Sequence, residues 1–418
     1  CGSSGSNNKT DSSNKKSDGA TSDSSSKPVT IVWSRGKDST KASQEVVKAF
    51  EAKYPNIHVK IRELPNSSGT QHDTYATELN AKSSDIDVFN IDVVWPAEFA
   101  QAGWTQPLDQ FVQQDNYDMS QYNQGALSGA KYNGKTWAIP LYIDAGMLFY
   151  RTDIVPKDKV PTTWDQLYAE AKAYKGQKGT QFGYAAQMDQ YEGLVCNAIE
   201  FIYAYGGRVV DQNNKVVVNS PQTIKGLKEM VKFANAGFVP KNINTFQETQ
   251  TANAFASGQS VFVRNWPYQY AVGNDKSQSK IVGNVGIAPL PKGDSQSAAA
   301  LGGWMLAMNK YSNHKKEAWT FMKFLAGKDG EKINAIVGGL APTIPSLYQD
   351  PDILKANPFF ANQNFVNGLA SAVPRPVVAN YQQVSDIIQV EVSKAINNKE
   401  TVEQAVQNMQ TQLEKVIK

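Results

Sequence analysis

The chain has 418 residues, 41% of them hydrophobic, and its 42 basic and 39 acidic residues leave a net charge of +3. This length is enough for two domains with sizeable cores, and the balanced charge excludes a general electrostatic attraction to nucleic acid or membrane. No apolar run approaches the ~20 residues that span a bilayer. The two cysteines and three histidines form no zinc-ligand pattern, so we expect neither a metal nor a cofactor.

The first 27 residues differ in composition from the rest. Residues 2–27 contain no Val, Ile, Leu, Met, Phe, Trp or Tyr and cannot bury enough apolar surface to order themselves. Cys1 followed by Gly-Ser-Ser-Gly resembles the N-terminus of a bacterial lipoprotein after signal-peptide removal. We therefore expect residues 1–27 to be a disordered tether that a lipid on the Cys1 thiol holds at the outer face of the bacterial cell membrane. The alternative is an arbitrary chain start at Cys1.

Strand and helix patterns alternate regularly from residue 29 onward. The predicted elements are strands at residues 29–33, 57–62 and 87–91 and helices around residues 46–54 and 71–82. This order implies right-handed crossovers and a mainly parallel sheet. Ligands bind at the carboxyl edge of such a sheet, and the segment Ser34–Ser39, Glu63 and Asp92 all follow strands there.

The stretch around Pro140 combines the features of a domain hinge. Pro140 has no N–H, so we expect a strand of the first sheet to stop there, and Met147–Tyr150 reads as a new buried strand. Tyr142 and Asp144 lie between them. One interpretation is a plain turn with Asp144 in solvent. The other is a seam between two domains, the second entered at Gly146, and ligands often bind in such seams.

A second set of elements follows the hinge. Capping sequences predict helices that begin after Thr163, Ser220 and Thr401. Residues 261–263 read as a strand, and residues 314–326 have the apolar spacing of a helix. The chain therefore continues as an α/β protein to its end.

The chain carries no catalytic motif that would identify an enzyme. It has no Gly-x-Ser-x-Gly nucleophile elbow, no phosphate-binding Gly-x-x-x-x-Gly-Lys-Ser/Thr loop and no dinucleotide fingerprint. Three scattered histidines argue against a Ser–His triad. A carboxylate pair for glycoside hydrolysis stays open, because any two of the 39 acidic residues can meet in the fold.

Several aromatic residues stand beside Gly or Pro in predicted loops. Trp266 and Tyr268 flank a proline, and Trp304 follows Gly302 and Gly303, which would let a ligand approach the backbone. A single Trp is more often part of a core than of a binding site, but together these loop positions favour a site. Aromatic faces with carboxylates and Arg suit a sugar, although a peptide or an amine would use the same set.

Seven sequence blocks run in order across residues 28–418, at residues 87–95, 102–109, 139–151, 191–196, 264–268, 301–304 and 372–376. In these blocks the sequence resembles the extracytoplasmic solute-binding proteins of carbohydrate ABC importers, most closely the trehalose- and maltose-binding branch. The resemblance implies a two-lobed, periplasmic-binding-protein-like α/β fold, each lobe a mainly parallel sheet flanked by helices, with three chain crossovers at the hinge. It divides the chain into lobe I, residues 28–142 and 300–342, and lobe II, residues 143–299 and 343–418.

The resemblance also implies which residues meet the ligand. Those expected to line the interlobe cleft are Asp92, Tyr142, Asp144, Tyr191, Glu192, Trp266, Tyr268, Gly302, Gly303, Trp304, Arg375 and Tyr381, with Asp38, Ser39 and Glu63 at the far end of the sugar. Two departures bear on the choice of sugar. The loop Arg35–Ser39 is short and lacks the Glu of its relatives, and Glu63 stands near a position where trehalose- or maltose-binding relatives can carry Arg.

From these observations we expect a membrane-tethered, monomeric binding protein that is not an enzyme. It would capture a small α-linked glucose oligosaccharide, such as trehalose, maltose or a short maltooligosaccharide, and pass it to the transmembrane subunits of an ABC importer, with no nucleic acid as partner. One alternative is a secreted glycoside hydrolase, which needs two positioned carboxylates. The other is a surface adhesin, which would not close on a small ligand.

Overall fold

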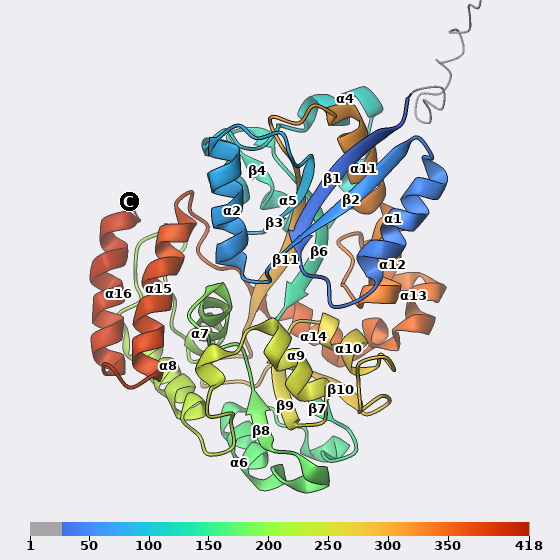
Figure 1. Cartoon of the computed structure of the whole chain (residues 1–418). Helices are drawn as coiled ribbons and strands as arrows, with labels where there is room; N and C mark the ends of the chain where they lie inside the picture. The colour runs from blue at the N-terminus through green and yellow to red at the C-terminus, as the bar shows by residue number, and fades with distance from the viewer. Residues whose placement is uncertain (1–26, 418) are drawn as a thin grey trace, which may run out of the picture.

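Two β-sheets, each covered by helices, form the two lobes of the protein (Figure 1). The computed structural model describes residues 27–417, so the predicted lipid site Cys1 and all but the last residue of the predicted tether lie outside the described residues. The sheet of lobe I has the order β12-β11-β3-β1-β2, with β6 also paired to β11. Its strands are β1 (Val29–Gly36), β2 (Ile57–Leu64), β3 (Val88–Asp92), β6 (Ile139–Ala145), β11 (Ala299–Met308) and β12 (Ala372–Val373).

The sheet of lobe II has the order β10-β7-β9-β8. Its strands are β7 (Met147–Arg151), β8 (Phe182–Ala185), β9 (Ser260–Asn265) and β10 (Val285–Pro289). Strand β7 is antiparallel to both β9 and β10, while β8 and β9 are parallel. Each sheet is therefore mixed: most strands share one direction as predicted, but β11 and β12 in lobe I and β7 in lobe II run in the opposite direction.

Helices cover both sheets and the junction between them. The helices of lobe I are α1 (Ala42–Lys53), α2 (Ser68–Asn80), α3 (Pro96–Gln101), α4 (Asp109–Asp115), α5 (Gln124–Ser128), α11 (Lys315–Leu325) and α12 (Lys328–Gly338), beside the ribbon β4 (Lys131–Tyr132) and β5 (Lys135–Thr136). Those of lobe II are α6 (Trp164–Tyr174), α7 (Glu192–Ala204), α8 (Pro221–Ala234), α9 (Glu248–Ala256) and α10 (Tyr268–Gly273). Helices α13 (Pro351–Ala356) and α14 (Gln363–Ala370) follow, and α14 contacts both β6 and β10. The final helices, α15 (Tyr381–Ile396) and α16 (Val402–Val416), pack on α7 and α8 (Figure 1).

Within each lobe, an apolar core holds the secondary-structure elements together. In lobe I the fully buried Trp33 and Phe50 meet Phe321 of α11 with ring-centroid distances of 5.4 and 4.9 Å, both edge to face. In lobe II, Trp164 of α6 stacks on Phe201 of α7 at 4.1 Å. These rings tie helices to the sheet in lobe I and helix to helix in lobe II, so each lobe offers a rigid edge on which a site can be built.

The predicted helix starts are correct, and their caps differ in detail. The hydroxyls of Thr163, Ser220 and Thr401 each accept a hydrogen bond from the backbone N–H three residues later. The side chain of Gln166 returns to the N–H of Thr162 and not to that of Thr163, so the predicted reciprocal capping box is incomplete there. Each helix nevertheless begins at the expected residue.

The prediction that a strand stops at Pro140 is wrong. Strand β6 continues through Pro140 to Ala145, because β11 shifts register between Trp304 and Met305 opposite it. At such a bulge the strand ladder does not need an N–H donor at one position, so a proline is tolerated there. The chain leaves the sheet of lobe I and enters the sheet of lobe II at Gly146. This point lies later in the chain than the predicted boundary after residue 142. Strand β12 at residues 372–373 pairs with β11 of the lobe I sheet, although the prediction gave these residues to lobe II. The division of the other residues between the lobes stays a prediction.

The crossing at Gly146 passes over a buried ion pair. Glu200 and Arg264 are both fully buried and are joined by two hydrogen bonds of 2.6 and 2.7 Å. A Cβ at Gly146 would stand only 1.9 Å from a Glu200 oxygen, so no larger residue fits. The same Glu200 carboxylate accepts a hydrogen bond of 2.9 Å from the backbone N–H of Ala300 in β11. One ion pair therefore fixes two strands at the junction of the lobes.

Candidate ligand-binding site

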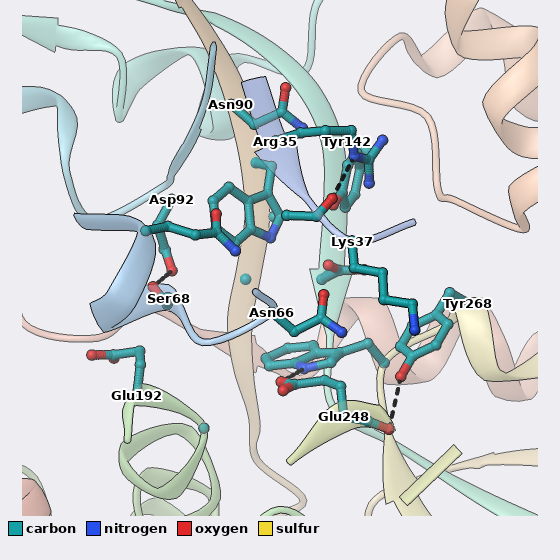
Figure 2. A pocket seen from close by; sticks show the side chains of 18 of the residues that line it. Arg35, Lys37, Asn66, Ser68, Asn90, Asp92, Tyr142, Glu192, Glu248 and Tyr268 are labelled. Atoms are coloured by element: carbon teal, nitrogen blue, oxygen red, sulfur yellow. Dashed lines mark hydrogen bonds between the residues drawn. The ribbon is translucent and has the colours of Figure 1, made fainter. Parts of the chain in front are cut away.

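A cavity of about 140 Å³ lies between the lobes, beside the carboxyl ends of β1 and β3 and the N-terminal ends of α7 and α9. One water molecule needs only about 10–15 Å³ of such volume, so the cavity is larger than a packing defect by roughly tenfold. Figure 2 shows Arg35, Asn90 and Tyr142 reaching it from lobe I, and Glu192 and Glu248 from lobe II. Both lobes therefore contribute side chains to one space.

Thirteen of the residues predicted for the site line this cavity. They are Asp38, Ser39, Asp92, Tyr142, Asp144, Tyr191, Glu192, Trp266, Tyr268, Gly302, Gly303, Trp304 and Arg375. They come from strand ends and helix starts far apart in the sequence, and their roles toward a ligand stay predictions.

Two predicted residues do not line the cavity. The side chain of Glu63 is exposed, and its Oε2 accepts a hydrogen bond of 2.9 Å from the backbone N–H of Asp38, so it holds the loop after β1. Tyr381 is 1% exposed, and its hydroxyl donates to Glu192 Oε2 beneath the cavity wall. Both residues support residues of the site and do not face the space themselves.

Asp38 lines the cavity, but its carboxylate is already satisfied. Oδ1 accepts hydrogen bonds from the N–H and the hydroxyl of Thr40, and Oδ2 accepts them from the N–H and the hydroxyl of Ser43. Burial opposes ionisation, but Arg35 and these hydrogen bonds together lower the pKa of Asp38. Its role is to shape the loop that precedes α1.

A buried network around Arg375 joins the two lobes. Its guanidinium donates to Asp92 Oδ1 in lobe I at 3.1 Å and to Glu192 Oε2 in lobe II at 2.9 Å. Glu192 also accepts hydrogen bonds from Tyr381 and Ser385. Burial raises the pKa of Glu192 even though Arg375 opposes the rise. Because both oxygens of Glu192 accept hydrogen bonds from protein donors, we infer that the network forms the floor of the cavity.

Asp144 differs from the other carboxylates of the cavity. It is 7% exposed, and its buried Oδ1 accepts no hydrogen bond from any residue in the range 27–417. Burial raises the pKa of Asp144 to about 7, with Arg264 opposing the rise and Asp92 and Glu248 adding to it. A buried acceptor without a partner is costly, and a ligand donor would remove that cost. The interpretation of Asp144 as a solvated turn residue is wrong.

Trp266 is held in a fixed orientation at the cavity wall. The Arg264 guanidinium lies 4.2 Å from its ring centroid, and the indole N–H donates to Glu248 Oε2 at 3.1 Å. A Cβ on Gly302 would come within 2.9 Å of the indole, so the glycine makes room for the ring. The indole is half-buried, which leaves part of it open to a ligand.

Strand β11 brings two glycine residues, which have no side chain, beside polar residues of β6. Gly302 pairs with Asp144, and Trp304 pairs with Tyr142. Gly303 has φ +127°, and a Cβ there would stand 2.5 Å from the carbonyl oxygen of Tyr142. The half-buried Trp304 packs edge to face on Trp95 at 5.6 Å, so it too is a fixed aromatic surface.

The structure adds residues that sequence reasoning missed. They are Thr40, Asn66, Ser68, Gln71, Asn90, Gly193, Cys196, Glu248, Gly338 and Leu340. Arg35, Gly36 and Lys37 also line the cavity, and they belong to the segment Ser34–Ser39 that was predicted at this edge. Asn90 stands two residues before Asp92 on β3, so strand alternation would have placed both side chains on one face. Glu248 carries no such signal, because only the tertiary fold brings α9 beside Trp266.

Two properties of the described residues bear on the kind of site. Among residues 27–417, no group of three or more His, Cys, Asp or Glu side chains is arranged to hold a metal ion. Within the same range, no helix combines the length and the apolar character needed to cross a bilayer.

A two-lobed α/β fold with a cavity lined by both lobes defines a class of proteins that enclose small solutes. The family of bacterial extracellular solute-binding proteins matches residues 36–332, and the chain belongs to this family. The chain is similar to a probable ABC transporter-binding protein of Deinococcus radiodurans, with 35% identity over 377 residues, 87% of this chain and 88% of that protein.

Solved structures and a further relative agree with this family. The maltose-bound MalE3 of T. maritima has 36% identity and a TM-score of 0.87, over 93% of this chain and 100% of that chain. A galactooligosaccharide-binding protein of Bacillus subtilis is 23% identical over 349 residues, 80% of this chain and 77% of that protein. The predicted two-lobed fold is thereby confirmed, as is the prediction of a binding protein in place of an enzyme.

Proposed function

We propose that the protein captures a small α-linked glucose oligosaccharide, such as maltose, trehalose or a short maltooligosaccharide, and delivers it to an ABC importer. The observation that carries this proposal is the unpaired Oδ1 of Asp144 in a cavity that is also lined by two fixed indoles, Trp266 and Trp304. A sugar offers hydroxyl donors for the carboxylate and C–H faces for the rings.

The solved relative described above is bound to maltose. This supports an α-linked glucose disaccharide as the ligand. The short loop after β1 contributes Lys37 and Ser39 to the cavity, and its difference from the relatives is the feature most able to alter the choice of sugar.

Hydrolysis is a weaker interpretation of the same cavity. A glycosidase needs two carboxylates free to act on one glycosidic bond. In the described part of the chain, Asp38, Asp92, Glu192 and Glu248 all accept hydrogen bonds from protein groups, whereas the buried Oδ1 of Asp144 accepts none. The cavity thus offers one buried carboxylate oxygen without a donor among the described residues, and the chain belongs to a family of solute-binding proteins, so both observations favour binding without turnover.

Isothermal titration with a sugar panel tests the proposal. Maltose, trehalose, maltotriose, cellobiose and lactose would each be titrated, and the recovered sugars analysed after long incubation. We expect saturable binding of an α-linked glucoside and recovery of intact sugar. Release of glucose would indicate a hydrolase, and binding of cellobiose or lactose about tenfold more tightly, or about 1.4 kcal/mol, would overturn the proposed specificity.

The proposal places the protein at the outer face of the bacterial membrane, in agreement with the extracellular description of its family. A lipid on Cys1 would hold it there, and two acyl chains are needed for stable anchoring. Mass spectrometry of protein extracted from native membranes should detect the added lipid. An unmodified Cys1 in the soluble fraction would contradict tethering.

A further inference from the structure

The first turn of α9 contacts three aromatic residues of the cavity wall. Glu248 Oε1 accepts the hydroxyl of Tyr191 at 2.8 Å, and Oε2 accepts the indole N–H of Trp266 at 3.1 Å. The backbone carbonyl of Glu248 accepts the hydroxyl of Tyr268 at 3.2 Å, as Figure 2 also shows. Both carboxylate oxygens are therefore occupied by protein donors.

These donors keep their protons over the whole working pH range. Burial, followed by the Glu248 charge, raises the pKa of Tyr191 well above its ordinary value, and the same two causes raise the pKa of Tyr268. The indole of Trp266 can only donate. Glu248 must accept for this arrangement to persist, and an apolar residue of the same size would leave Tyr191 and Trp266 without a partner.

The same helical turn reaches across to the other lobe. The hydroxyl of Thr249, the next residue, accepts a hydrogen bond of 3.0 Å from the side-chain amide of Asn66. Asn66 follows β2 of lobe I. The first turn of α9 is thus supported by the cavity wall on one side and by lobe I on the other.

We propose that Glu248 is a positioning residue that fixes Tyr191 and Trp266 in the orientation the ligand meets, without contacting the ligand itself. This rests on the proposed function of the cavity as a sugar site. The carboxylate acts through its acceptor geometry and not through its charge, because both its oxygens already accept from neutral donors. Affinity should then follow whether the two hydrogen bonds can be made.

Two substitutions of similar size separate geometry from charge. In Glu248→Gln the amide oxygen can accept from Trp266, while the amide N–H donates to the Tyr191 hydroxyl oxygen, so both contacts survive without the charge. In Glu248→Met neither contact is possible. Glu403→Met is the matched control, because Glu403 is also an acidic residue in the first turn of a helix, paired there with Lys228 far from the cavity.

Each variant of the full chain would be titrated with the sugar that binds the wild type best. Near-ultraviolet circular dichroism of the ligand-free protein would report the order of the rings. We expect Glu248→Gln to bind within about threefold of the wild type, and Glu248→Met to lose about tenfold or more together with aromatic signal. Glu403→Met should match the wild type in both measurements.

Three results would overturn the proposal. Equal weakening of Glu248→Gln and Glu248→Met would show that the charge, or a direct ligand contact, matters. Wild-type affinity in Glu248→Met would show that the rings need no such support. An unchanged aromatic signal in ligand-free Glu248→Met would exclude positioning. The dichroism needs no ligand, so a failure of the wild type to bind any sugar would reject the sugar site while still testing the role of Glu248.

Discussion

Replacement of Asp144 by Ala should weaken sugar binding without harming the ligand-free fold. A hydrogen bond to a charged group contributes about 1.5–3 kcal/mol. If Asp144 accepts two sugar hydroxyls, and water partly refills the space, the loss is about 2–4 kcal/mol, or roughly 30- to 1000-fold in Kd. Titration calorimetry gives the affinity and a thermal melt gives the stability. Near-wild-type affinity, or unfolding of the ligand-free variant, would refute the assignment of Asp144 to the ligand.

The ligand-free protein should in fact gain stability when this carboxyl is neutralised. The pKa of Asp144 is about 7 in the folded state against an ordinary value of 3.8, so the folded protein binds the proton more strongly than the unfolded chain does. Stability therefore falls as pH rises from about 4 to about 7, by at most about 4 kcal/mol from this group. Asp144→Asn should remove this fall, so the variant should melt above the wild type at pH 8 but not at pH 4. Parallel pH profiles of the two proteins would contradict the reasoning.

Three further predictions follow from the same contacts. Sugar binding by the wild type should tighten between pH 6 and pH 8, because hydroxyl donors favour the ionised form of Asp144, and calorimetry of Asp144→Asn should show no such trend. In the same assay we expect a loss of about 2–4 kcal/mol of binding free energy for each of Trp266→Ala and Trp304→Ala, as for buried aromatic anchors. Unchanged affinity in both variants would place the ligand elsewhere. Tyr381→Phe should lower the unfolding free energy in a denaturant titration by about 1–2 kcal/mol, because Glu192 loses a buried donor, and should leave the sugar affinity within about threefold; a larger affinity loss would return Tyr381 to the ligand site.

The order of strands and helices was predictable because it depends on local patterns. A buried apolar run marked β1, apolar alternation marked β2, and the hydroxyls of Thr163, Ser220 and Thr401 marked helix starts. Pro140 misled the prediction because its missing N–H is tolerated beside a bulge at Leu141 of β6, which arises from pairing with β11, a strand more than one hundred residues away in the sequence. A rule about one residue cannot anticipate the register of a distant partner.

The site was predictable in part for similar reasons. Gly302 and Trp304 were found because glycines next to a tryptophan are visible in sequence, but they lie within strand β11 and not in the predicted loop. Tyr381 and Glu63 were wrongly placed in the cavity because sequence distinguishes poorly between a residue that faces a ligand and one that supports a facing residue. Glu248 was missed because its importance for the site depends entirely on tertiary contacts with Tyr191 and Trp266.

The most direct test of the central claim is whether an α-linked glucose disaccharide brings the lobes together. The helices α1 and α6 lie in different lobes, and each carries an exposed lysine, Lys48 and Lys172. In a chain whose Cys1 is replaced by Ser, both lysines would be changed to Cys and spin-labelled. Pulsed electron paramagnetic resonance would then measure the interlobe distance. Saturating maltose or trehalose should shift the distances to one shorter population, cellobiose should not, and Asp144→Ala should require far more sugar for the same shift. Distances that do not change with any bound α-glucoside, or that shorten with cellobiose alone, would contradict the account.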